Sequence, residues 1–298
     1  MRPPDHVFKL MKTTVKYFIA WLFLLLCSFT DAQAHPSISI VVDSQGNIFY
    51  SDLTNVWIIY PDGHKEIAVP NVHTHELWLS PEDVLFGEDV TNSGDDYRHR
   101  LWSRQPDGSL QDEIPWRAGF PDQFGDYSFA RDKQSRSYVL RREKRRIDVR
   151  SDTQVEYTIP LEQFPGHIYW LIAQADGVIY VAVGEKLLRI EPNSKEAGII
   201  AQGLIERSKA FDFVQDRHAI MGLWSNNQGE VYVSVFSGQV VKHVAKSGKV
   251  TEVLRNEGDW SVSGGTIDRD GSLLLLEFST ANEVRVRRVK TTGESEEL

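Results

Sequence analysis

The stretch that decides the fold is SISIVVDSQGNIFYSDLTNVWIIYPDGHKEIAV, residues 37–69. It divides into short apolar strands separated by turns. The four predicted strands are Ser37–Val42, Ile48–Asp52, Val56–Ile59 and Lys65–Val69. Gly46 supplies a positive φ in the first turn, and Pro61-Asp62-Gly63 presets a tight reversal in the last. This pattern predicts one small antiparallel sheet.

The same unit recurs along the chain. Six copies begin at Ser37, Glu76, Tyr127, Tyr169, Ile220 and Gly264. Spread over residues 35–298, they average 44 residues each, within the range of about 40–50 for propeller blades. Their inner strands are apolar almost throughout, as expected where neighbouring blades cover both faces. The sequence therefore predicts an all-β fold, a single six-bladed β-propeller of four-stranded antiparallel blades over residues 35–298.

Three details of the pattern are less regular. The third unit is expected to open with an inner strand at Tyr127–Arg131, and the second to carry a long acidic loop at Asp89–Tyr97. The sixth unit has no obvious fourth strand, since the acidic tail Gly293–Leu298 is a poor one. Either the last blade has three strands or the register is displaced by one strand.

The first 34 residues have the pattern of a signal peptide. Four basic residues precede the apolar run Tyr17–Cys27, and Ala32-Gln33-Ala34 follows it as a cleavage signature. The run is short for a bilayer span. We predict removal of residues 1–34 and a periplasmic or secreted protein; the alternative is a retained anchor.

The predicted mature chain is acidic and free of cysteine. Loss of residues 1–34 leaves a net charge of −11 and removes Cys27, the only cysteine. Stability must therefore come from packing without disulfides. The negative charge argues against nucleic acid and anionic membrane surfaces as partners. We expect a monomer that contacts neither nucleic acid nor, after signal cleavage, a membrane.

The motif Asp43-Ser44-Gln45-Gly46-Asn47-Ile48, followed by Pro61-Asp62-Gly63, resembles the NHL-repeat propellers and the senescence-marker/gluconolactonase family. The resemblance covers the mature chain at the level of turns and strand pattern, and it implies a six-bladed propeller. Members of the gluconolactonase group bind a divalent cation through a Glu, Asn and Asp set. The early Glu of that set is absent here, because Ser37 stands in its place.

Histidines gather at one predicted opening of the propeller, near the starts of the inner strands. His73 and His75 flank Thr74 in an extended segment, so their imidazoles point to the same side. His218 or His167, from other blades, would complete a three-histidine site with an open position for water. We therefore predict one divalent metal ion, zinc or calcium, at these histidines. The alternative is that they bond backbone carbonyls.

Carboxylates are expected at the same opening. Glu88 and Glu277 end the second strands of blades two and six, and Glu76 precedes the inner strand of blade two. Either carboxylate of blade two would orient a ligating imidazole or move a proton, and Glu277 follows the very apolar strand Leu273–Leu276. We predict all three as catalytic residues. The alternative, favoured for Asp52, is that these acids cap loops or neutralise arginines.

A basic run, Arg141-Arg142-Glu143-Lys144-Arg145-Arg146, crosses the predicted turn between the second and third strands of blade three. Its simplest interpretation is a solvated hairpin tip. As a functional feature, it would attract an anionic ligand to the same opening.

Two kinds of function fit the sequence. One is a metal-dependent hydrolase or lyase, similar to a lactonase, acting on a small polar or carbohydrate-like molecule in the channel mouth. The other is a non-catalytic propeller that binds a ligand or protein in the periplasm. The convergence of histidines and carboxylates favours the enzyme slightly.

Overall fold

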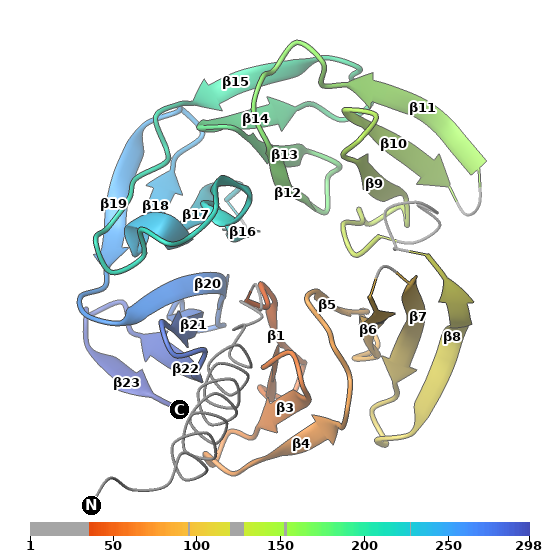
Figure 1. Cartoon of the computed structure of the whole chain (residues 1–298), viewed down its shortest axis with the longest axis vertical. Coiled ribbons are helices and arrows are strands. Elements are labelled where there is room, and N and C mark those ends of the chain that lie inside the picture. Colours follow the sequence, from red (N-terminus) through yellow and green to blue (C-terminus); the bar gives the residue numbers. More distant parts are fainter. Residues whose placement is uncertain (1–35, 95, 120–127, 152–153, 227) are drawn as a thin grey trace, which may run out of the picture. The chain divides into compact units, whose positions relative to one another are not determined.

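The structure, a computed structural model, describes residues 36–298 except for 95, 120–127, 152–153 and 227. The predicted signal peptide, residues 1–34, lies outside the described residues. Six antiparallel sheets surround a central axis and form a six-bladed β-propeller (Figure 1). In the described part of the chain, no helix is long and apolar enough to cross a membrane.

Blades are numbered along the chain, and the strands of each blade are called A to D from the central axis outward. Blade 1 consists of β1 (Ile40–Val42), β2 (Ile48–Ser51), β3 (Val56–Ile59) and β4 (Lys65–Val69). Blade 2 consists of β5 (Leu77–Leu79), β6 (Leu85–Ser93), β7 (Asp96–Arg104) and β8 (Leu110–Ala118). Blade 3 consists of β9 (Ser137–Arg141), β10 (Arg146–Ser151) and β11 (Gln154–Pro160).

The other three blades each have four strands. Blade 4 consists of β12 (Ile168–Ala173), β13 (Ile179–Val183), β14 (Lys186–Ile190) and β15 (Ala197–Ala201). Blade 5 consists of β16 (Gly222–Ser225), β17 (Val231–Val235), β18 (Val240–Val244) and β19 (Val250–Arg255). Blade 6 consists of β20 (Trp260–Ile267), β21 (Leu273–Ser279), β22 (Val284–Val289) and β23 (Ser295–Glu297). Two short 3-10 helices, η1 (Asp216–His218) and η2 (Phe236–Gly238), lie in connections.

Of the two alternatives stated for the last blade, the three-stranded one is wrong. Blade 6 is complete, because the acidic tail supplies β23 opposite the Arg287–Val289 segment of β22. Arg287 faces Glu297 and Arg288 faces Glu296 in that register, so basic residues offset the acidic composition. Blade 3 has three described strands. Of its predicted inner strand, Tyr127 lies outside the described residues, and Arg131 forms an isolated bridge with Ser137.

The predicted loop Asp89–Tyr97 is instead a β-hairpin. Strands β6 and β7 pair continuously, from Leu85 opposite Arg104 to Ser93 opposite Asp96. Thr91 lies in this extension, where β-branched residues favour extended backbone. Strand β8 lengthens alongside, so blade 2 projects further than its neighbours at one end.

Three of the A–B turns are held by an Asp or Asn side chain at their first residue. Asp43 Oδ1 accepts hydrogen bonds from the amides of Gln45 (2.9 Å) and Asn47 (2.8 Å). Asp132 and Asn226 make the same pair of bonds in blades 3 and 5. Such local bonds replace the ladder where the chain reverses. They explain why Asp or Asn recurs at the first position of these three turns.

The core is divided between neighbouring blades. Apolar clusters join blades 1 and 2, 3 and 4, 4 and 5, 5 and 6, and 6 and 1. The last of these closes the ring by packing Ile40 and Ile48 against Leu274 and Leu276. Every strand of blade 6 comes from the C-terminal part of the chain, so side-chain packing closes the ring instead of a strand shared between the two ends.

Candidate functional site

The topology puts several connections at the same opening. In each four-stranded blade, the antiparallel order A-B-C-D places the B–C turn and the connection to strand A of the next blade at one end. We call this end the D–A opening. His73, His75, His167 and His218 all lie in connections to strand A, so the sequence placed these histidines at the correct end of the propeller.

Glu88 lies at this opening in the interior of blade 2. Its Oε1 accepts hydrogen bonds from the backbone amides of His75 (2.8 Å) and Glu76 (3.1 Å). The same oxygen lies 3.4 Å from His75 Nδ1. The predicted meeting of a second-strand end with an inner-strand start is therefore present, with Glu76 contributing its amide to the contact.

Burial controls the protonation of this pair. Glu88 is 6% exposed, and burial raises the pKa of its carboxyl to about 7, against the opposing effect of the bonds from the backbone amides. Burial, assisted by the nearby His73, lowers the pKa of His75 to about 3. Near neutral pH the His75 imidazole is uncharged, whereas the raised pKa of Glu88 brings its carboxyl within range of proton exchange. A carboxyl in that condition can accept or donate a proton.

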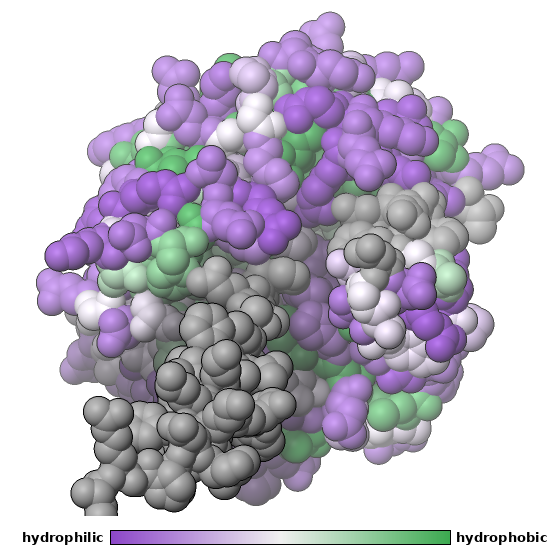
Figure 2. All heavy atoms as spheres, viewed as in Figure 1, coloured by the Kyte–Doolittle hydropathy of each residue, from purple (hydrophilic) through white to green (hydrophobic). Residues whose placement is uncertain are grey.

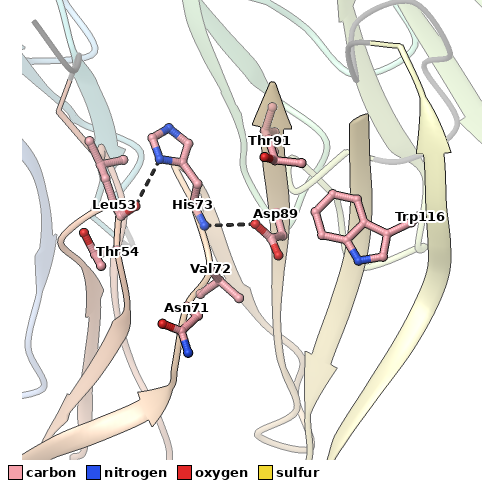
Figure 3. Close-up of a pocket in the computed structure, with 9 residues that line it drawn as sticks. Leu53, Thr54, Asn71, Val72, His73, Asp89, Thr91 and Trp116 are labelled. Carbon is pink, nitrogen blue, oxygen red and sulfur yellow. Dashed lines mark hydrogen bonds between the residues drawn. The ribbon is translucent and has the colours of Figure 1, made fainter. Parts of the chain in front are cut away.

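His73 lies next to this pair and lines a pocket. Its ring meets the His75 ring edge to face, with 4.7 Å between centroids. Its Nδ1 donates a hydrogen bond to the backbone carbonyl of Leu53 (3.0 Å), and its backbone amide donates one to Asp89 Oδ1 (3.0 Å) (Figure 3). These bonds tie the blade 1 turn, the connection and β6 together.

The pocket lies between blades 1 and 2 and has a volume of about 370 Å³. Figure 3 shows the blade 1 turn on one side, the 71–73 connection in the middle, and β6 with the outer strand β8 on the other. Its lining residues are Leu53, Thr54, Asn71, Val72, His73, Asp89, Val90, Thr91 and Trp116. The wall thus combines one imidazole, one carboxylate, hydroxyl and amide groups, and one indole ring.

The Asp89–Trp116 side of the pocket is held by arginines. Arg100 Nε donates to Asp89 Oδ2 (3.0 Å) and its Nη1 to Asp112 Oδ1 (3.0 Å). The Arg100 and Arg98 guanidiniums lie over the Trp116 ring, 5.2 and 5.7 Å from its centroid. Sequence reasoning missed Asp89 and Trp116 as site residues because it placed Asp89 in a loop. Residues Leu85–Ser93 show no strict alternation, so the local pattern gave little signal for this extension of the hairpin.

Glu277 is a structural residue, which corrects its predicted catalytic role. It is fully buried, with Oε2 accepting from Arg285 Nε (2.7 Å) and Oε1 accepting from Arg287 Nε (3.0 Å) and Asn256 Nδ2 (2.8 Å). Such a network satisfies both carboxylate oxygens. Asp52 is structural as well, as favoured from the sequence. It accepts bonds from the amides of Thr54 and Asn55 and from Trp57 Nε1 (2.6 Å).

The predicted three-histidine metal site is not formed. The described residues contain no group of three or more His, Cys, Asp or Glu side chains that could hold a metal ion. His167 packs against Tyr169 in blade 4, and His218 ends η1 before blade 5, whereas His73 and His75 belong to blade 2. Figure 1 shows the inner strands spread around the ring, so residues that share one opening belong to different sides of it.

Much of the surface around the blades is hydrophilic. Figure 2 shows polar residues dominating the face over blades 3 to 5, with hydrophobic residues in small separate areas. Exposed large hydrophobic residues occur mostly on outer strands, among them Ile67, Val155 and Ile199. Scattered exposed apolar residues of this kind are ordinary.

Comparisons with known proteins identify the fold. No protein-family model matches the sequence, and no curated protein matches it. Among solved structures, a streptogramin B lyase shares 12% identity with a TM-score of 0.55, covering 82% of this chain and 91% of the lyase. A catalytically inactive virginiamycin B lyase variant from Staphylococcus aureus, solved with quinupristin, shares 14% identity with a TM-score of 0.54, covering 90% and 85%.

Two further structures widen the range of functions on this fold. An auxiliary nutrient binding protein from Bacteroides thetaiotaomicron shares 12% identity with a TM-score of 0.53, covering 81% of this chain and 66% of that protein. Regucalcin, a calcium-binding protein from Agrobacterium tumefaciens, shares 12% identity with a TM-score of 0.51, covering 81% and 82%. At such identities the likeness shows the fold alone. The chain is a six-bladed β-propeller, and the fold-level resemblance to the senescence-marker/gluconolactonase group is confirmed.

Proposed function

We propose that the mature chain is an exported β-propeller that binds a small polar or carbohydrate-like molecule in the pocket between blades 1 and 2. The observation that carries the proposal is the pocket wall, which offers the Trp116 indole beside the Asp89 carboxylate and the Thr91 hydroxyl. A volume of about 370 Å³ suits a small ligand. An aromatic surface next to acceptors and donors can stack on a ring while bonding its hydroxyl groups.

Export is part of the same proposal. It rests on the charged, apolar and small-residue pattern of residues 1–34. The fold is shared with an auxiliary nutrient binding protein and with the extracellular domain of a putative hybrid two component system, both from Bacteroides thetaiotaomicron, so a binding role outside the cytoplasm is compatible with it. Fractionation of cells that express the full chain tests this point. Recovery of uncleaved protein from the cytoplasm would refute it.

The binding test uses the mature chain and a panel of monosaccharides, disaccharides, sugar acids and sugar lactones, measured by calorimetry. We expect saturable binding of at least one member. Trp116→Ala should weaken it at least tenfold, and Trp116→Phe should retain most of it. Thr91→Val should weaken binding, whereas the matched change Thr251→Val on the exposed strand β19 should not. Equal effects of the two threonine variants would refute the assignment of the pocket.

A second candidate is acid–base catalysis on the bound molecule by pocket-lining His73, with His75 and the buried Glu88 behind it as positioning residues, which would be a hydrolase or lyase activity. It is favoured by the buried carboxyl with a pKa of about 7 and by the contact of the His75 ring with pocket-lining His73. The test measures lactone hydrolysis and double-bond formation with the same panel. Glu88→Gln should lower turnover while leaving the dissociation constant within about threefold, because Glu88 does not line the pocket. Binding without turnover in the wild type would leave the non-catalytic function as the correct one.

A further inference from the structure

The basic run of blade 3 is not used by the proposed pocket, and the structure gives it a specific location. Arg142 and Arg145 lie in the B–C turn between β9 and β10, and both reach the connection that enters blade 4. Arg145 donates through Nη1 to the carbonyl of Gly166 (3.0 Å) and through Nη2 to that of Phe164. Arg142 donates through Nη2 to the carbonyl of Tyr169 (2.8 Å) and through Nε to that of Ile168 (3.3 Å). The two guanidiniums therefore bracket His167.

A third guanidinium approaches from the next connection. The Tyr169 hydroxyl donates to the backbone carbonyl of Asp216 (2.7 Å), which fixes η1 beside the start of β12. Arg217 follows Asp216 in that helix and is exposed. The positive charges of Arg142, Arg217 and Arg145, after burial, all act to lower the pKa of His167. Two segments, the blade 3 turn and η1, thus bring three cationic side chains to one exposed imidazole.

The contacts described for Arg145 and Arg217 do not cancel the charges of these two residues. The acceptors of Arg145 are peptide carbonyls, which are neutral, and within the described residues neither Arg145 nor Arg217 forms an ion pair. Asp216, the acid closest in sequence to Arg217, is paired with Arg207. In a mature chain of net charge −11, such a concentration of positive charge at one opening is unusual. Guanidinium groups recognise oxyanions through several N–H groups at once.

We propose that His167, Arg142, Arg145 and Arg217 form a binding site for an oxyanion group, a phosphate or a carboxylate, at the D–A opening. Arg142 and Arg145 are pre-organised by their carbonyl bonds, and Arg145 has further N–H groups to donate. Arg217 closes the site from η1, and the imidazole of His167 supplies a donor that becomes charged when an anion binds. The site shares the opening with the pocket of blades 1 and 2 but uses none of its residues. The two proposals can therefore be tested independently.

The test titrates the mature chain with inorganic phosphate, and in parallel with acetate, against chloride at constant ionic strength. The imidazole resonances of His167 are followed by NMR and assigned by their loss in His167→Gln. We expect saturable shifts and a rise in the His167 pKa with phosphate, with acetate, or with both. The responding anion identifies the class of ligand. Shifts that grow linearly and equally in all three salts would overturn the proposal.

Charge-removing variants separate binding from structure. Arg217→Gln should weaken anion binding about tenfold, because a charge-assisted bond is lost. It removes no hydrogen bond made by the described residues, so folding should be unaffected, as thermal unfolding can verify. The control Lys249→Gln makes the same charge change on an exposed turn at the opposite opening. If Arg217→Gln binds the anion as well as Lys249→Gln does, the site is not where we place it.

Discussion

The substitution Glu88→Gln tests the buried carboxyl at the centre of the site. The amide has nearly the same shape, and its oxygen can still accept the bonds from the amides of His75 and Glu76. The substitution removes only the ionisable group at this position. Burial raises the pKa of Glu88 from 4.5 to about 7, and a shift of that size corresponds to about 3 kcal/mol.

The direction of the pH dependence of stability follows from which state, folded or unfolded, binds the proton more tightly. Above pH 7 the carboxylate is charged in both states, and its burial destabilises the folded protein by the full amount. As the pH falls from 7 to 4.5, the folded state takes up the proton first, so the destabilisation disappears. His75 works in the opposite direction. Its pKa is lowered from 6.5 to about 3, so its contribution to stability is lost as the pH falls below 6.5.

The assay is urea unfolding of the wild type and Glu88→Gln, followed by tryptophan fluorescence at pH 4.5, 5.5, 6.5 and 8. Contributions from His75 and other groups largely cancel in the difference between the two proteins. We expect the free energy of unfolding of Glu88→Gln, minus that of the wild type, to be about 3 kcal/mol higher at pH 8 than at pH 4.5. The variant is thus relatively more stable at pH 8. The control Glu82→Gln changes an exposed residue of the same blade. If the free-energy difference between the two proteins changes by less than about 1 kcal/mol across this pH range, the raised pKa of the buried Glu88 carboxyl is refuted.

Three other predictions follow from the fold and the site. Arg287→Ala should lower the unfolding free energy by about 3 kcal/mol in urea, because it removes a partner of the fully buried Glu277 carboxylate; an effect below about 1 kcal/mol would contradict this role. Gly264→Ala should destabilise by about 3 kcal/mol or more, since the new Cβ would lie 1.8 Å from a backbone oxygen across the ring closure. Gly198→Ala, with only an ordinary contact at 3.8 Å, should change stability by less than about 1 kcal/mol in the same assay. His75→Ala should leave the thermal response to added zinc or calcium unchanged, because the described residues offer no three-donor group; a metal-induced rise in melting temperature that the variant loses would contradict this.

The fold could be predicted from the sequence because its signals are local. The turn that begins at Asp43 and the strands around it are specified by residues within a few positions of one another, and the pattern repeats. The same reasoning failed at β23, where acidic residues form a strand because Arg287 and Arg288 lie opposite them. It failed again at Thr91, where the partner strand extends a hairpin. In both cases the deciding partner is not part of the local pattern.

The candidate site was predicted only in part, for a geometric reason. Topology allows the correct opening to be inferred, and it correctly joined Glu88 to the segment of His75. It does not give distances around the ring, so residues of blades 2, 4 and 5 were grouped although the described residues form no such three-donor group. Glu277 shows a second limit. An acid after an apolar strand looks functional until Arg285 and Arg287, from the next strand, are seen to neutralise it.

The closure of the ring has a consequence for how the chain can be rearranged. Each blade is built from strands that are consecutive in the sequence, and the last residue, Leu298, packs in the same cluster as Ile38 near the start of blade 1. A short linker could therefore join Leu298 to the segment before Ile38, and new ends could be opened in another exposed connection, without separating any pair of neighbouring strands. Circular permutants cut between whole blades should thus retain all six sheets and differ mainly in the order in which the blades are synthesised.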